Sequence, residues 1–193
     1  GQGVTLEIAF SASTPAPPET PENLPVPGLH PRLWWGCDSH DDYEVKLSTP
    51  EEYTVVASGR LDPESGTYHI EKAPSFVVWL ARGYGVLEGQ AGDVLVRCLH
   101  EPANRKCAQL LVDAAVDAIT FYRDRFGFYP YPALTIVPGD QPAGGYSVAA
   151  GIVAIHGMSR MEEQPQSHWR WITAHEIGHQ YWGEYVTDKD DPA

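Results

Sequence analysis

The amino-acid sequence predicts an α+β fold, in which an antiparallel β-sandwich portion comes first and a portion of mixed helices and strands follows. Two observations predict it. Short apolar runs separated by turn residues recur between residues 33 and 100, which is typical of an antiparallel sandwich. After Pro102 the hydrophobic period changes from that of a strand to that of a helix. We therefore expect a domain boundary near residue 102, with one portion over residues 1–102 and another over residues 103–193.

Strands account for most of the first portion. Residues 4–10 have the pattern of one strand. Residues 11–31 are so rich in proline that a linker or a long surface loop is expected, because proline fits neither a helix interior nor a central strand. Alternating and apolar runs predict further strands at residues 43–47, 53–58, 68–71, 76–81 and 94–99. Turns are expected at residues 62–66 and 89–92.

A long helix is expected to open the second portion, over residues 103–126. Its apolar side chains follow one helical stripe, whereas Asp113, Asp117 and Asp124 lie mostly off that stripe. Gly127 suits the position that follows a helix end, where the backbone often adopts a left-handed conformation.

Two further strands and a second helix are expected after this helix. Residues 134–137 and 148–155 have strand character, and a glycine-rich stretch at residues 142–145 separates them. The second helix is expected from about Ser167, which is a suitable N-cap, to about Val186.

Composition and charge exclude several classes of protein. The chain has 13 Lys and Arg against 26 Asp and Glu, a net charge of −13, which argues against binding to a nucleic-acid backbone. No apolar run reaches the roughly 18 residues that a membrane span needs. The three cysteines, none of them in a CxxC pair, predict neither a disulfide framework nor a structural zinc cluster. Oligomeric state and compartment stay open.

The expected second helix contains an HExxH motif, formed by His175, Glu176 and His179. Residues four apart lie on one face of a helix, so both imidazoles can bind one zinc ion. Glu176 lies beside that face and can take a proton from a water that the metal activates. The histidines also fall on a stripe with Ile172, Trp182 and Val186, which predicts that they face the interior. The alternative is a helix whose two buried histidines have other partners.

Residues 175–186 (HEIGHQYWGEYV) resemble the zinc-helix signature of the gluzincin aminopeptidases, the family of membrane alanyl aminopeptidase and leukotriene hydrolase. Residues 125–137 are similar to the family's helix-to-strand junction, and residues 53–59 to a strand of its sandwich domain. The resemblance covers most of residues 33–193. It implies that the second portion is the N-terminal part of a thermolysin-like catalytic domain, with zinc as cofactor and peptides as substrates.

The glycine-rich stretch carries a departure from the family. Gly144, Gly145, Tyr146 and Ser147 stand where the family has a Gly-x-Met-Glu-Asn loop, and they are the candidate substrate-binding residues. The two glycines would let a substrate backbone approach closely, and the strand expected at residues 148–155 would accept a peptide as an extra strand. In the family, the glutamate of that loop binds the free amino terminus. Ser147 occupies the matching position and has no charge. Either another carboxylate supplies the anchor, or the protein is not a strict aminopeptidase. A plain hairpin turn is the alternative interpretation of this stretch.

The resemblance also implies a third zinc ligand nineteen residues after His179 and, further downstream, a tyrosine that stabilises the oxyanion. Both positions lie beyond the 193 residues of this chain. The chain, which begins without Met, is therefore expected to be part of a longer protein, and by itself to bind zinc weakly or not at all and not to hydrolyse peptides. Glu184 is expected to point away from the site, about 140° around the helix from His179.

The leading hypothesis is a zinc-dependent, aminopeptidase-like metallopeptidase with Glu176 as its catalytic base. The alternatives are a peptidase-like binding module that does not cleave and a thermolysin-like endopeptidase. Weaker hypotheses concern three other features. The acidic run at residues 38–42 could bind a cation, and His156 and His168 are expected to lie at the surface or behind the metal ligands.

Overall fold

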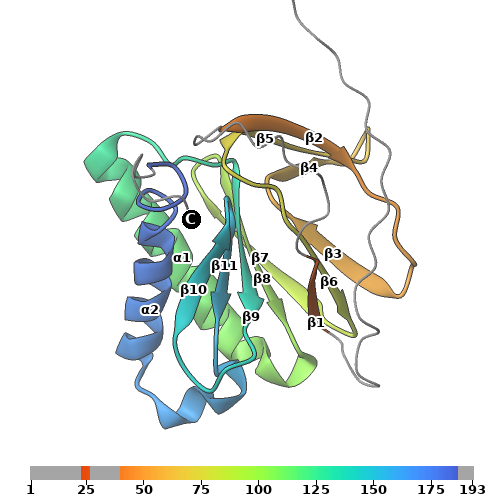
Figure 1. Ribbon diagram of the computed structural model, residues 1–193. Coiled ribbons are helices and arrows are strands. Elements are labelled where there is room, and N and C mark those ends of the chain that lie inside the picture. Colours follow the sequence, from red (N-terminus) through yellow and green to blue (C-terminus); the bar gives the residue numbers. More distant parts are fainter. Residues whose placement is uncertain (1–22, 27–39, 187–193) are drawn as a thin grey trace, which may run out of the picture.

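The computed structural model describes residues 23–26 and 40–186, which form stacked layers of sheet and helix (Figure 1). Two three-stranded sheets, one five-stranded sheet and a pair of long helices make up these layers. The predicted α+β class is confirmed. The strand expected at residues 4–10 lies outside the described residues, as does most of the proline-rich segment.

The two three-stranded sheets are both antiparallel. One has the order β2 (Asp41–Lys46), β5 (Thr67–Ala73) and β4 (Arg60–Asp62), and the other has the order β1 (Asn23–Val26), β6 (Val78–Arg82) and β3 (Tyr53–Ala57).

The sheet that contains β3 and β6 has apolar contacts on both of its faces. Ala57 and Val78 pack toward the sheet of β2, β5 and β4, whereas Val56 and Trp79 pack toward the five-stranded sheet. Successive strand residues point to opposite faces, so each strand contributes to both clusters. This sheet is therefore the middle layer of the β portion.

The five-stranded sheet has the order β10 (Gly145–Ala149), β11 (Ile152–Ile155), β9 (Ala133–Pro138), β8 (Val94–His100) and β7 (Gly85–Ala91). Its three central strands are parallel, and each outer strand is antiparallel to its neighbour. Because β7 and β8 precede residue 102 and the others follow it, this sheet crosses the expected domain boundary. The division into two domains stays a prediction.

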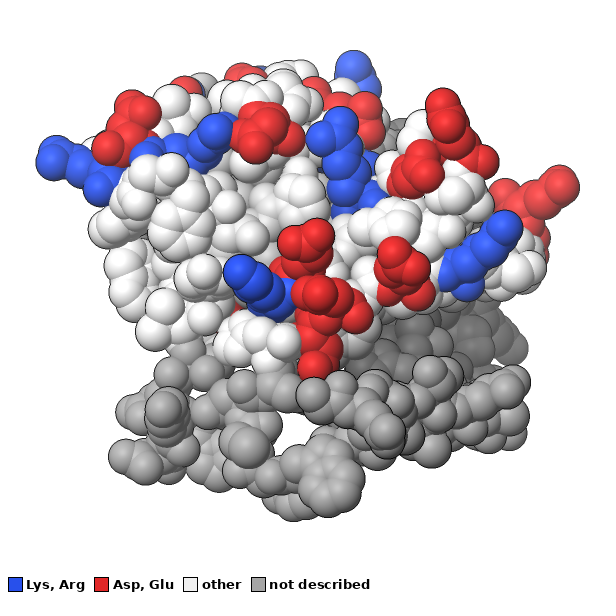
Figure 2. Space-filling model, turned by 90° about the horizontal axis from the view of Figure 1, so that it is seen from above, with Lys and Arg blue, Asp and Glu red and all other residues white. Residues whose placement is uncertain are grey.

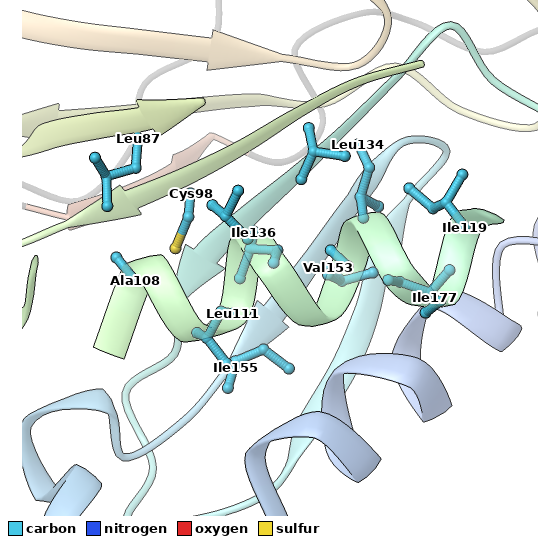
Figure 3. Close-up of a cluster of buried hydrophobic side chains, with 14 of the residues drawn as sticks. Leu87, Cys98, Ala108, Leu111, Ile119, Leu134, Ile136, Val153, Ile155 and Ile177 are labelled. Carbon is cyan, nitrogen blue, oxygen red and sulfur yellow. The ribbon is translucent and has the colours of Figure 1, made fainter. Parts of the chain in front are cut away.

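Two helices cover one face of the five-stranded sheet. Side chains from α1 (Arg105–Phe126) and α2 (Gln166–Gly178) join the sheet in the largest buried cluster, which Figure 3 shows around Leu111, Ile136 and Ile177. Two short 3₁₀ helices, η1 (Pro102–Asn104) and η2 (Met158–Glu163), precede α1 and α2. The apolar stripe predicted for α1 is buried from Cys107 to Ile119, but Tyr122 is half-buried and Phe126 is exposed. Asp113, Asp117 and Asp124 are exposed, and Gly127 is left-handed at φ +84°.

Two predicted features of this sheet are wrong. The turn predicted at residues 89–92 is right only for Gly92, which lies in the turn between β7 and β8, whereas residues 89–91 belong to strand β7. The glycine at 89 lets the sheet lie close to α1, because a Cβ there would be 2.6 Å from Cγ1 of Val112. Residues 148–155 form parts of two strands instead of one, because the chain reverses at Ala150 and Gly151, where Gly151 has φ +76°.

The expected linker at residues 11–31 contains strand β1, which the proline content argued against. Pro25 is tolerated because β1 is an edge strand, whose outward N–H groups need no partner. On the face seen in Figure 2, Lys and Arg side chains lie among Asp and Glu instead of gathering in one patch. Neither helix in the described parts of the chain combines the length and apolar character that crossing a bilayer requires.

Candidate metal centre

The HExxH motif lies where the C-terminal end of α2 meets edge strand β10 (Figure 1). Helix α2 is held against α1 by the Tyr122 hydroxyl, which donates a hydrogen bond to the Ala174 carbonyl at 3.1 Å, and by an ion pair between Arg170 and Asp117. The hydrogen bond from Tyr122 lies in the turn that carries the motif, and the exposed ion pair lies in the first half of α2.

Helix α2 is shorter than predicted, and its end changes the orientation of the motif. It begins after Pro165 instead of at a Ser167 cap, and it ends at Gly178, with His179 as the C-cap. The chain then turns through Gly183, whose φ of +128° excludes a helix there. The expectation that the helix runs to Val186 is therefore wrong.

The buried face of α2 is centred on Ile172, Thr173, Glu176 and Ile177, and both histidines are exposed. The predicted inward stripe is wrong because it counted Trp182 and Val186, which lie beyond the helix end and are exposed. The carboxyl group of the motif is therefore buried, and its two imidazoles are exposed.

The three motif side chains are gathered at one point. Each of His175, Glu176 and His179 offers a ligand atom, and these atoms all lie within 4.8 Å of one another. The two imidazole rings are nearly perpendicular, at 88°, with centroids 4.9 Å apart. Nδ1 of His179 lies 3.3 Å from the carbonyl oxygen of Trp182, and a ring that donates from Nδ1 keeps the lone pair of Nε2 for a metal ion. This nitrogen and oxygen donor set suits zinc.

Glu176 is 2% exposed, and its carboxyl group packs against strand β10. Burial raises the pKa of this carboxyl group, while the positive charge that His175, His179 and His156 can carry opposes the rise. A Cβ at Gly145 would lie 2.8 Å from both Cγ and Oε1 of Glu176. Only glycine leaves room on β10 for this carboxyl group.

The structure brings the glycine-rich stretch to the motif. Gly144, with φ +98°, leads into β10, Gly145 contacts Glu176, and Tyr146 is exposed beside the His156 ring at 5.5 Å. The hairpin between β10 and β11 turns at residues 150–151, so these residues are not the turn itself. They form the edge of the sheet beside the three gathered side chains.

Gln180, which no sequence pattern singles out, and Glu184, which is expected to point away, both lie at the site. Gln180 is fully buried: its Nε2 donates to Ser147 Oγ at 3.0 Å, and its Oε1 accepts a hydrogen bond from the Gly151 N–H at 2.7 Å. Ser147 Oγ in turn donates to Glu184 Oε1 at 2.7 Å. Glu184 therefore points toward β10, contrary to the expectation, because it lies on a turn and not on a continuing helix.

The weaker candidates do not belong to the three gathered side chains, although His156 lies close enough to Glu176 to act on the pKa of its carboxyl group. His156 is buried, and its Nδ1 accepts a hydrogen bond from the Gln141 N–H at 3.0 Å, which leaves the ring proton on Nε2. His168 is half-buried near the start of α2. Of the acidic run at residues 38–42, Asp42 accepts a hydrogen bond from the Lys72 N–H, and residues 38–39 lie outside the described residues.

No model of a known protein family matches this chain, and no curated protein matches it. The fold and the chemistry of the site therefore carry the functional assignment.

Proposed function

We propose that this chain is part of a zinc-dependent metallopeptidase of the gluzincin type, aminopeptidase-like in its choice of substrate. The observation that carries the proposal is the grouping of two exposed imidazoles and one buried carboxyl group within 4.8 Å, beside a glycine on an edge strand. The helices on the five-stranded sheet would then be the N-terminal part of a thermolysin-like catalytic domain.

His175 and His179 would hold the zinc ion, together with a third protein ligand from outside the described residues, since catalytic zinc sites use three protein ligands. When bound, zinc supplies a Lewis acid that polarises a carbonyl group and lowers the pKa of water. The exposure of both imidazoles leaves their nitrogens accessible to the metal and to that third ligand.

Glu176 is the proposed general base. Its burial raises the pKa of the carboxyl group, and a base whose pKa is closer to the working pH holds a proton more readily in the transition state. Its contact with Gly145 fixes the carboxyl group relative to β10. Because Gly145 adds no side chain, a substrate backbone can approach the carboxyl group along the same strand.

Strand β10 is the proposed peptide-binding edge. It pairs only with β11 in the described sheet, so its other side can accept a peptide as an additional strand. Main-chain hydrogen bonds along such an edge would bind peptides with little regard to side chain, and would hold the bond to be cut near Glu176.

The contact between Ser147 and Glu184 favours an aminopeptidase over an endopeptidase. Ser147 itself has no charge, but it holds the Glu184 carboxylate beside β10. A strand advances about 3.4 Å per residue, so Ser147 lies about 7 Å from Gly145. A carboxylate held at Ser147, two residues along the edge from Gly145, would suit a substrate whose free amino group lies one or two residues before the bond that is cut.

Hydrolysis of leucyl- and alanyl-arylamides tests the proposal, measured on the zinc-loaded protein that contains this chain. We expect turnover that Glu176→Gln lowers by about 10²- to 10⁴-fold, the usual contribution of a general base. Glu162→Gln is the matched control, since Glu162 is an exposed carboxylate on η2, paired with Lys106 at 3.2 Å.

The same assay separates the other candidates. Cleavage of a peptide with a blocked amino terminus at a comparable rate would indicate an endopeptidase. Tight peptide binding without cleavage of either substrate would contradict the catalytic proposal and favour a binding module.

A further inference from the structure

The exposed face of α2 carries a row of aromatic and imidazole side chains that leads to the metal centre. Trp171 is 60% exposed, and it lies one turn before His175. Its ring stacks on the His175 ring, with centroids 5.5 Å apart and planes at 28°. His179 contacts the same imidazole at 88°. The His175 ring therefore has one neighbour against its plane and another nearly perpendicular to it.

The two histidines differ in how their rings are oriented. The carbonyl oxygen of Trp182 lies within hydrogen-bond distance of Nδ1 of His179, and such a bond is the usual device that orients a metal-binding imidazole. Among the described residues, His175 has no hydrogen-bond partner for either ring nitrogen, and its side chain is exposed. An unrestrained imidazole on a helix surface samples several rotamers, and binding a metal ion would restrict it to one.

We propose that Trp171 is a positioning residue of the metal centre, which holds the His175 ring in its metal-binding orientation by stacking. The inference rests on the proposed metal centre. Trp171 takes the place of the hydrogen bond that His175 lacks, and a large flat indole restricts rotation of the ring without competing for its nitrogens. A merely structural pair of aromatic side chains four residues apart would stabilise the helix and leave metal affinity unchanged.

Copper(II) binding to the 193-residue chain distinguishes these two roles, because Cu²⁺ binds imidazole more tightly than zinc does. Affinity is measured by isothermal titration and by quenching of tryptophan fluorescence. Stacking of this kind contributes enough that Trp171→Ala should weaken Cu²⁺ binding about fivefold. Trp171→Phe, which keeps a stacking ring, should bind within about twofold of the wild type. Phe121→Ala is the matched control, since Phe121 is an exposed aromatic residue on α1.

The outcomes separate this inference from the metal centre itself. His175→Ala should abolish the Cu²⁺ site. If it does, and Trp171→Ala binds Cu²⁺ as tightly as the wild type, the positioning role is overturned and the metal centre stands. If His175→Ala leaves Cu²⁺ affinity unchanged, both are overturned. Circular dichroism at the titration temperature measures the helix content of Trp171→Ala. If this variant has lost helix, its weaker Cu²⁺ binding reflects the loss of helix, and the positioning role is overturned.

Discussion

The hydroxyl of Ser147 donates a hydrogen bond to Oε1 of Glu184 at 2.7 Å, which joins edge strand β10 to the turn that follows the HExxH helix. The backbone N–H of Glu184 donates to the His179 carbonyl at 3.1 Å, so Glu184 is joined to the motif by its backbone and to the strand by its carboxylate.

Replacing Glu184 by glutamine is expected to raise KM for substrates with a free amino terminus by about tenfold or more, because a charge-assisted hydrogen bond contributes about 1.5–3 kcal/mol. Cleavage of an amino-blocked peptide should change little. Steady-state kinetics on both substrates checks this. Ser147→Ala, which keeps the charge, serves as the control and should have the smaller effect. Equal losses on free and blocked substrates would contradict an amino-terminal anchor at Glu184.

Replacing Gln180 by alanine is expected to lower the free energy of unfolding by about 2–4 kcal/mol, because it leaves the buried Gly151 N–H without its acceptor and opens a cavity. Urea denaturation measures the loss. Gln109→Ala is the control: this exposed glutamine donates to Asp113 on the same helix and should cost less than about 0.5 kcal/mol. Similar losses in the two variants would mean that Gln180 does not join β10 and β11 to the motif.

Replacing Gly145 by alanine is expected to destabilise the protein by about 1–3 kcal/mol, since the new Cβ would lie 2.8 Å from the Ala154 carbonyl and from the Glu176 carboxyl group. The same substitution in a Glu176→Ala background removes one of these two contacts. In that background, Gly145→Ala should lower the free energy of unfolding by less than it does in the wild type. A double-mutant cycle measured by denaturant unfolding checks this. Additive costs would contradict the contact between Gly145 and Glu176.

The stability of the metal-free chain is expected to depend on pH through Glu176. Burial raises the pKa of its carboxyl group above the ordinary value of 4.5, so the folded state binds the proton more tightly than the unfolded state does. The resulting stabilisation is complete below pH 4.5 and is lost as pH rises through the folded-state pKa. Denaturation of Glu176→Gln, which has no such proton, should lack this loss. Parallel pH profiles in the two proteins would contradict it.

Some of the fold and the site could be predicted from local sequence patterns. Helix α1 combines a continuous apolar stripe with a terminal glycine, and both signals depend only on residues close in sequence. The grouping of His175, Glu176 and His179 likewise follows from their spacing across the last turn of a helix.

Other features depend on contacts that sequence spacing does not contain. The apolar residues Trp182 and Val186 continue the helical spacing, but α2 ends at Gly178 and the backbone turns at Gly183. The spacing therefore predicts the wrong buried face for α2. Gly89 has the composition of a turn, but it is a strand residue because α1 packs against it. The contact of Glu184 with Ser147 joins residues 37 apart, and it exists only because the helix ends early.

Zinc content is the most direct measure of the central claim. The protein that contains this chain, purified without chelators, is to be examined by elemental analysis beside its His175→Ala variant and a His168→Ala control, since His168 lies outside the three gathered side chains. A metallopeptidase centre on α2 predicts about one zinc ion per chain in the wild type and the control and almost none in His175→Ala. Equal zinc content in all three proteins, or no zinc in any of them, would contradict it.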